Sequence, residues 1–242
     1  PREPLVHQII RLEELAGIAG LTIVAAYFRP WDATWQLPGT AWIFITFGLG
    51  ATVGLVAYAI LRRRTTPAES IVLLLGTVAF ASGLASNLLL SPIVVCFVAG
   101  ALIVNFPGGY KERVGASLAR LERPVYFLFL VVVGAIWQIG DWRGWALTVV
   151  FLVARFFGGW LGVRLGWNQG ELALSRDEQV VLAAAPMGQL SIAIVISALL
   201  LYPEGTVPQM VTAVLVGSIF TEVVVQLLAR ELRRAPAKRG AP

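Results

Sequence analysis

One arginine, Arg155, lies at the middle of a segment, Trp145–Trp167, that otherwise has the composition of a single apolar span. A helix of these 23 residues is about 35 Å long, which is enough to cross the hydrocarbon core of a bilayer. A guanidinium at that depth costs between about 3 and more than about 10 kcal/mol, and arginine cannot lose its proton to avoid this cost. We therefore expect carboxylates, helix ends or water beside Arg155, and we take it as the first candidate functional residue.

The composition places the chain among membrane proteins. Charged residues make up only 14% of the 242 residues, against about 25% in soluble domains, and 57% are hydrophobic. The single cysteine, Cys96, excludes an internal disulfide, and one cysteine and one histidine, His7, are too few for a metal site of the usual kind. We expect no metal and no cofactor. We also expect no enzymatic activity, because the sequence shows neither a nucleophile–base pair nor a cluster of metal-ligand residues.

Hydropathy predicts an all-α, polytopic membrane protein with about eight transmembrane helices. The third and fourth helices are divided at Asn87–Pro92, where Ser91 can cap a helix that Pro92 begins. The predicted spans are approximately Leu5–Phe28, Thr40–Leu61, Ser70–Leu90, Pro92–Phe106, Pro124–Ile139, Trp145–Trp167, Glu178–Tyr202 and Gln209–Leu232.

The basic residues predict the orientation. With eight spans, fifteen of the nineteen lie on the face that carries both termini, and only Arg29 and Arg143 lie on the other. This asymmetry predicts cytoplasmic termini in the plasma (inner) membrane, with residues 1–232 as the transmembrane region and 233–242 as a short basic tail. The basic segments, such as Lys111–Arg123, would be short loops. Nucleic acid or anionic lipid could also bind them, but topology alone explains their position, and we expect the bilayer and no nucleic acid as partner.

Arg155 shares a helical face with Gly158, Gly159, Gly162 and Gly166, against which another backbone could pack. Two interpretations remain for this face. It is either a packing seam with one buried ion pair, or an electrostatic element beside an ion path.

Two later spans contain further polar candidates. Pro186 and Gly188, followed by Gln189 and Ser191, predict a broken helix whose ends point at an ion site, and an ordinary proline kink is the alternative. Glu222 in the last span could pair with Arg155, take up protons, or make a cap-like structural bond.

The first span contains two acidic residues, Glu13 and Glu14. If its helix extends back to about Leu5, both carboxylates lie near mid-depth, where they could bind a cation or a proton. If the helix instead starts near Leu12, they lie at the interface and favour the helix N-terminus.

Several of these stretches carry a family resemblance. They are Phe47–Gly54 running into Arg62–Arg64, Leu90–Pro92 through Phe97–Gly100, Phe127–Gly134, Ala154–Gly158 and Pro186–Ser191. In this order they resemble the monovalent cation/proton antiporter superfamily, which includes sodium/proton exchangers and Kef-type transporters. Met187 departs from the pattern, since an arginine is common there.

The resemblance implies an inverted-repeat fold that lacks most of its first repeat, so that the chain would begin partway through the fold. Glu13 and Glu14 can be placed on the family's acidic ion-binding pair. A rival register puts Ala19–Gly20 there and leaves no acid. The function implied is exchange of protons for a monovalent cation, sodium or potassium, by alternating access.

In that mechanism Glu14, with Glu13 beside it, would bind the ion, and Arg155 would be the fixed positive charge. Gln189 and Ser191 would line the broken helix, and Glu222 would be a structural or relay acid. The resemblance also implies a homodimer, or a separate chain that supplies the missing N-terminal helices. The alternative is a transport-inactive scaffold or subunit.

Overall fold

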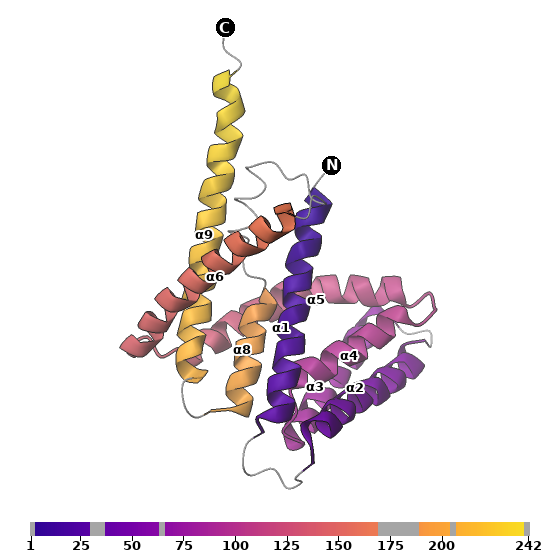
Figure 1. The fold of residues 1–242 in the computed structure, drawn as a ribbon. Coiled ribbons are helices and arrows are strands. Elements are labelled where there is room, and N and C mark those ends of the chain that lie inside the picture. Colours follow the sequence, from indigo (N-terminus) through magenta and orange to yellow (C-terminus); the bar gives the residue numbers. More distant parts are fainter. Residues whose placement is uncertain (1–2, 30–36, 63–65, 169–188, 204–206, 240–242) are drawn as a thin grey trace. The chain divides into compact units, whose positions relative to one another are not determined.

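The structure is a computed structural model, and it describes residues 3–29, 37–62, 66–168, 189–203 and 207–239. Within these residues the regular structure is entirely helical (Figure 1). The helices are α1 (Glu3–Tyr27), α2 (Gly39–Leu61), α3 (Pro67–Asn87), α4 (Pro92–Asn105), α5 (Lys111–Ile136), α6 (Trp142–Asn168), α8 (Gln189–Leu201) and α9 (Val207–Arg239).

The helices confirm the prediction of an all-α, polytopic membrane protein. Four are long and apolar enough to cross a bilayer, over Gly39–Leu61, Ala68–Asn87, Trp142–Gly162 and Val207–Val224. Shorter apolar stretches lie in α1, α4, α5 and α8. Hydropathy placed α2 and α4 to within one residue at each end, because loop residues interrupt the apolar runs at those points.

Helix α5 differs from its predicted bounds. It begins at Lys111 rather than at Pro124, which lies inside the helix. The residues before the proline are rich in good helix formers, and Tyr110 anchors their start by donating its hydroxyl proton towards the carbonyls of Ile103 and Phe106. Lys111–Arg123 is therefore the first half of a helix and not a loop. In the same way α9 continues past its predicted end, so that residues 233–239 are helical.

The chain divides into two compact units. The α2–α5 unit comprises Gly17–Trp137 and Ile196–Pro203, and the α6–α9 unit comprises Pro1–Ala16, Gln138–Val195 and Glu204–Pro242. The division falls within α1 and within α8, so each of these two helices contributes to both units.

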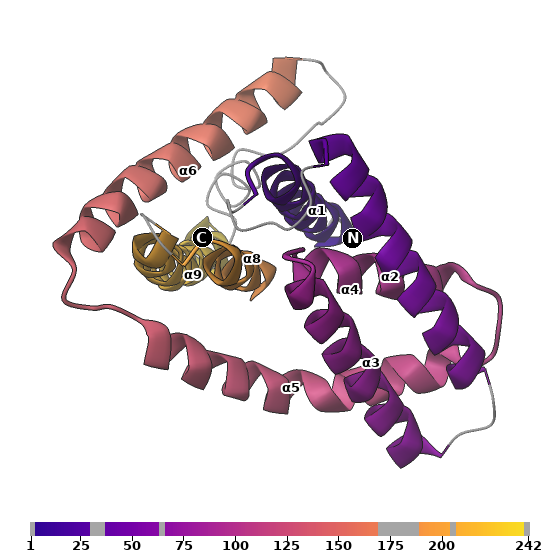
Figure 2. The same cartoon turned by 90° about the horizontal axis from the view of Figure 1, so that it is seen from below.

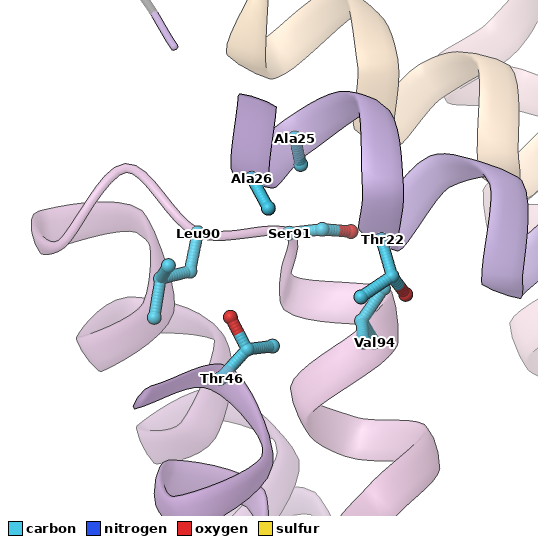
Figure 3. Close-up of a pocket in the computed structure, with 7 residues that line it drawn as sticks. All are labelled: Thr22, Ala25, Ala26, Thr46, Leu90, Ser91 and Val94. Carbon is cyan, nitrogen blue, oxygen red and sulfur yellow. The ribbon is translucent and has the colours of Figure 1, made fainter. Parts of the chain in front are cut away.

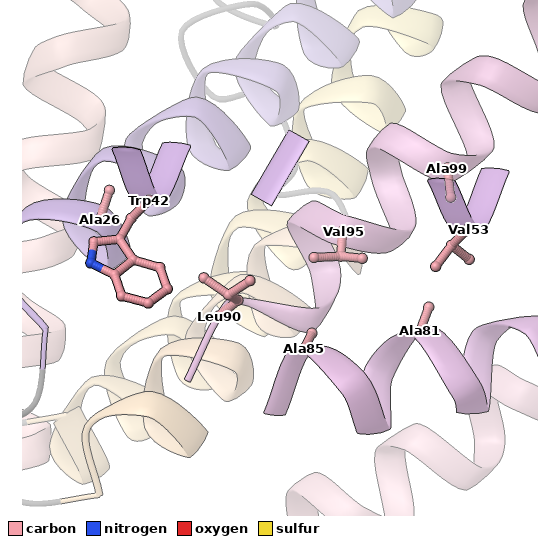
Figure 4. Close-up of a cluster of buried hydrophobic side chains, with 8 residues drawn as sticks. All are labelled: Ala26, Trp42, Val53, Ala81, Ala85, Leu90, Val95 and Ala99. Carbon is pink, nitrogen blue, oxygen red and sulfur yellow. The ribbon is translucent and has the colours of Figure 1, made fainter. Parts of the chain in front are cut away.

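The α2–α5 unit is built around the contact between α2 and α4, and α3 packs beside both (Figure 2). Small residues make this contact close. A Cβ added at Gly50 would stand 2.6 Å from Val98 Cβ, and one at Gly54 would stand 3.0 Å from the backbone of Ala99. Two apolar clusters fill the unit. The first contains Ala26, Trp42, Val53, Ala81, Ala85, Leu90, Val95 and Ala99 (Figure 4), and the second contains Ala57, Leu61, Leu74, Ile103, Tyr110 and Val114.

Two helix starts in this unit show different capping. At α3 the Thr66 hydroxyl accepts a hydrogen bond from the Glu69 amide, and the Glu69 carboxylate accepts one from the Thr66 amide. Helix α4 begins at Pro92 as predicted, but Ser91 makes no side-chain cap. Its hydroxyl is hydrogen-bonded to Ser197 instead, 2.9 Å away, so the predicted capping role of Ser91 was wrong.

The α6–α9 unit depends on the contact between its two long helices, which cross obliquely (Figure 1). Gly144 lies against Thr212, and Gly217 lies against the ring of Phe151. Among the described residues, nothing lies within 4 Å of a Cβ added at Gly158 or Gly162. The packing face expected after Arg155 stays a prediction.

Candidate functional site

A small cavity lies in the α2–α5 unit, where α1, α2 and the start of α4 meet (Figure 3). It measures about 10 Å³, close to the least volume that one water molecule needs. Three hydroxyl-bearing residues line it, Thr22, Thr46 and Ser91, and all are buried. The other lining residues are Ala25, Ala26, Leu90 and Val94.

A tight turn between α3 and α4 positions Ser91. Leu89 has a φ of +52°, in the left-handed region, and the amide of Leu90 donates to the carbonyl of Ala85 at 2.9 Å. This is the bonding pattern of a Schellman-type helix end. The chain therefore reverses within a few residues and leaves Ser91 only 2% exposed.

The hydrogen bonds determine what the cavity can bind. Thr22 donates its hydroxyl proton to the Ile18 carbonyl at 2.7 Å, and Thr46 donates to the Trp42 carbonyl at 2.8 Å. Each hydroxyl has one proton and two acceptor sites, so these two oxygens can only accept further bonds. Such a cavity suits a donor such as water. It contains no group that could change its charge near neutral pH.

In the same unit, the side chain of Arg29 contacts the C-terminal end of α3 and the first turn of α2. Arg29, just after α1, donates from Nη2 to the carbonyl of Leu88 at 2.8 Å, and its Cζ lies 3.4 Å from the ring centroid of Trp42. Its Nε and Nη1, and Trp42 Nε1, have no hydrogen-bond partner within the described part of the chain. The cation–π contact compensates the guanidinium in part. Burial lowers the pKa of Arg29, and nearby Tyr202 opposes this shift.

Helix α8 joins this unit through two hydroxyl groups. Ser197 is hydrogen-bonded to Ser91, and the Tyr202 hydroxyl donates to the carbonyl of Val24 in α1 at 3.3 Å.

The candidates predicted from the sequence lie in the other unit. Glu13, Glu14, Arg155, Gln189, Ser191 and Glu222 all fall within the residue ranges of the α6–α9 unit. Helix α1 begins at Glu3 and continues through Glu14 to Tyr27, so the alternative of a helix that starts near Leu12 was wrong. Glu14 is half-buried, and it lies close to the middle of this helix.

Arg155 is half-buried on α6, and α6 packs against α9. The ring of Phe156, its neighbour, meets the ring of Phe220 edge to face at a centroid distance of 6.5 Å. This contact brings the turn of α6 that carries Arg155 to the same level as the turn of α9 that carries Glu222. Glu222 is exposed rather than buried, and its carboxylate accepts a hydrogen bond from Gln226 at 3.1 Å.

The predicted helix break falls only partly within the described residues. Pro186 and Gly188 lie outside them. Gln189 is the first residue of α8, and Ser191 is half-buried two residues later. The roles of these residues as ion ligands stay predictions.

A carboxylate outside the spans joins α6 to α9. Asp141 accepts hydrogen bonds from the Arg143 amide at 3.0 Å and from Gln209 Nε2 at 2.9 Å. These bonds, together with the charge of Arg143, lower the pKa of Asp141. Asp141 therefore stays ionised at neutral pH and holds the starts of the two helices together.

Comparison with known proteins identifies the family. The family model for the transmembrane region of sodium/hydrogen exchangers matches residues 5–230. The chain belongs to the sodium/hydrogen exchanger family. Comparisons with curated proteins and with solved structures gave no significant match. The family assignment confirms the predicted antiporter resemblance and makes this exchanger a cation/proton antiporter in general terms, in a family of transporters rather than enzymes.

Sequence reasoning missed the hydroxyl groups of this exchanger. Thr22, Thr46 and Ser197 are each flanked on both sides by apolar residues, which is the one signal that could have marked them. That signal is weak, because a threonine in a helix commonly bonds back to its own backbone, as Thr22 and Thr46 do. The described residues contain no cluster of three or more metal-binding side chains.

Proposed function

We propose that this exchanger moves protons in one direction and a monovalent cation, sodium or potassium, in the other, and that Glu14 is the carboxylate that binds either. The observation that supports this role is the length of α1. The helix extends from Glu3 to Tyr27, so that Glu14 has about 16 Å of helix before it and about 20 Å after it. A helix that crosses the bilayer in this way carries Glu14 near mid-depth.

A carboxylate at mid-depth suits exchange for a physical reason. An ionised carboxylate without a partner is very unfavourable in an apolar medium, so it must bind a proton or a cation. One carboxylate cannot hold both, and each ion therefore displaces the other. Alternating access of this single site to the two sides of the membrane would then couple the two flows.

Arg155 has a supporting role in this proposal. Its charge is permanent, so it stabilises the empty, ionised carboxylate and competes with the bound cation. Gln189 and Ser191 would add neutral oxygen ligands from the start of α8. Glu222, on the turn of α9 that faces the turn of Arg155, would act as a structural or relay acid.

The experiment measures dissipation of a pH gradient in proteoliposomes when sodium or potassium is added. Glu14→Gln keeps the size of the side chain and removes its charge, so we expect it to abolish coupled flux, while Glu13→Gln weakens it. Glu112→Gln is the matched control, because Glu112 is exposed in the first turn of α5. Unchanged flux in Glu14→Gln would contradict the proposal and favour the Ala19–Gly20 register. No flux in the wild-type protein would favour a transport-inactive scaffold or subunit.

A further inference from the structure

The start of α4 lacks the side-chain cap that the start of α3 has. Its first residue is Pro92, which has no amide proton, and the amides of Ile93 and Val94 fall in the first turn, where a helix provides no acceptor. The N-cap residue Ser91 makes no cap bond, because its hydroxyl is hydrogen-bonded to Ser197. Val94 is only 1% exposed, so bulk solvent does not reach it. The amides of this turn therefore need an acceptor from inside the protein.

The hydroxyl-lined cavity lies against this turn and offers what the amides lack. Val94 lines it from α4, Thr22 from α1 and Thr46 from α2 (Figure 3). Both threonines have donated their protons to carbonyls of their own helices, so their oxygens can only accept further hydrogen bonds. The cavity therefore lies between donors on α4 and acceptors on α1 and α2.

Only a small molecule that both accepts and donates hydrogen bonds suits these surroundings. A volume of about 10 Å³ is enough for one water molecule and for little else. A cation would lie at the positive end of the α4 dipole, and the described lining residues include no carboxylate. An anion would face the oxygens of Thr22 and Thr46, which have no proton to give.

We propose that one ordered water molecule caps α4 from this cavity. It accepts a hydrogen bond from an amide in the first turn of α4, and it donates one to Thr22 and one to Thr46. Three partners are the usual number for a buried water. The water takes the role that a serine side chain usually has at a helix start, which leaves Ser91 available to Ser197. It also ties α1, α2 and α4 together at one point.

A high-resolution crystal structure of the full chain tests the site directly. We expect a single water peak within about 3.2 Å of both threonine oxygens and of one amide at the start of α4. Crystals soaked in rubidium salts and in bromide salts provide the second arm, because each of these ions gives an anomalous signal. The proposal fails if the cavity shows no peak, or if either ion occupies it.

A double-mutant cycle tests the shared water by reversible unfolding in mixed micelles. Valine keeps the shape of threonine and removes the hydroxyl, so Thr22→Val and Thr46→Val should each raise the unfolding equilibrium constant about two- to tenfold. The first substitution already loosens the shared water, so the second has less to lose. We expect the double variant to show a shift at least about twofold smaller than the product of the two single shifts.

Thr77→Val is the matched control for this cycle. Thr77 donates its hydroxyl proton to the carbonyl of Leu73, four residues earlier, in the same way as Thr22 and Thr46, but it does not line the cavity. Thr22→Val combined with Thr77→Val should therefore give the simple product of the single shifts. If Thr22→Val and Thr46→Val also give the simple product, the two residues share no water and the proposal is wrong.

Discussion

Replacing Gly50 by alanine would test how closely α2 and α4 pack. A Cβ at this position would stand 2.6 Å from Val98 Cβ and 2.9 Å from the carbonyl oxygen of Val95. Carbon atoms in contact prefer a separation of about 3.5–4.0 Å. The new methyl group must therefore displace the Val98 side chain or separate the two helices by roughly 1 Å.

The expected magnitude combines two opposing effects. Overpacking of this kind costs about 1–3 kcal/mol, while alanine stabilises a helix by about 1 kcal/mol relative to glycine. Gly48 is the matched control, because it lies two residues earlier on the same helix and a Cβ there would meet none of the described residues within 4 Å. Both variants gain the helix propensity, and only Gly50→Ala has the clash. We expect Gly50→Ala to be less stable than Gly48→Ala by about 1–3 kcal/mol.

The assay is reversible unfolding in mixed micelles, followed by helical circular dichroism as the denaturing detergent is titrated. Gly54→Ala should lie between the other two variants, because its Cβ would stand 3.0 Å from Ala99 rather than 2.6 Å from a neighbour. If Gly50→Ala is as stable as Gly48→Ala, the close contact between α2 and α4 is wrong.

Three further predictions concern the charged groups. The lowered pKa of Asp141 means that its contribution to stability is present above the ordinary aspartate pKa of about 4 and is lost as the pH falls through the lower folded value. Melting temperature measured against pH should therefore fall more steeply below about pH 4 in wild type than in Asp141→Asn, and parallel curves would contradict this role. Arg155→Ala should impair exchange or shift its pH profile in vesicles, and Arg155→Lys should be milder; wild-type kinetics in folded Arg155→Ala would leave the residue with a structural role only. Single cysteines at positions 62–64, in a Cys96→Ala background, should be labelled only from the cytoplasmic side, and labelling from outside would contradict the orientation.

The sequence was most informative where local pattern alone decides the structure. Apolar runs bounded by loop residues predicted α2 and α4 closely. The same reasoning failed at α5, where Pro124 suggested a helix start but lies inside a helix that the preceding residues begin. A proline removes one backbone donor, and the thirteen helical residues before it, ten of them good helix formers, outweigh that loss.

The hydroxyl cavity could not be predicted, because it depends on contacts between distant parts of the chain. Ser91 and Ser197 are separated by 106 residues, and no periodicity in either segment indicates the other. Ser91 was recognised as a possible cap from its position before Pro92, but a tertiary partner took its hydroxyl instead. Local rules identify which groups need a hydrogen bond, whereas the fold decides which partner supplies it.

The hydroxyl cavity and the proposed carboxylate site at Glu14 permit different chemistry. This difference bears on where exchange takes place. In the cavity, Thr22 and Thr46 have committed their protons to backbone carbonyls, and a hydroxyl has no accessible ionised state near neutral pH. Such a centre can hold water but cannot trade a proton for a cation. Exchange needs a group that can bind either a proton or a cation, and this is why we propose a carboxylate, Glu14 on the continuous helix α1, for that role. If the proposal holds, the hydroxyl cavity cannot replace the carboxylate, and loss of Glu14 should stop the coupled flow rather than divert it.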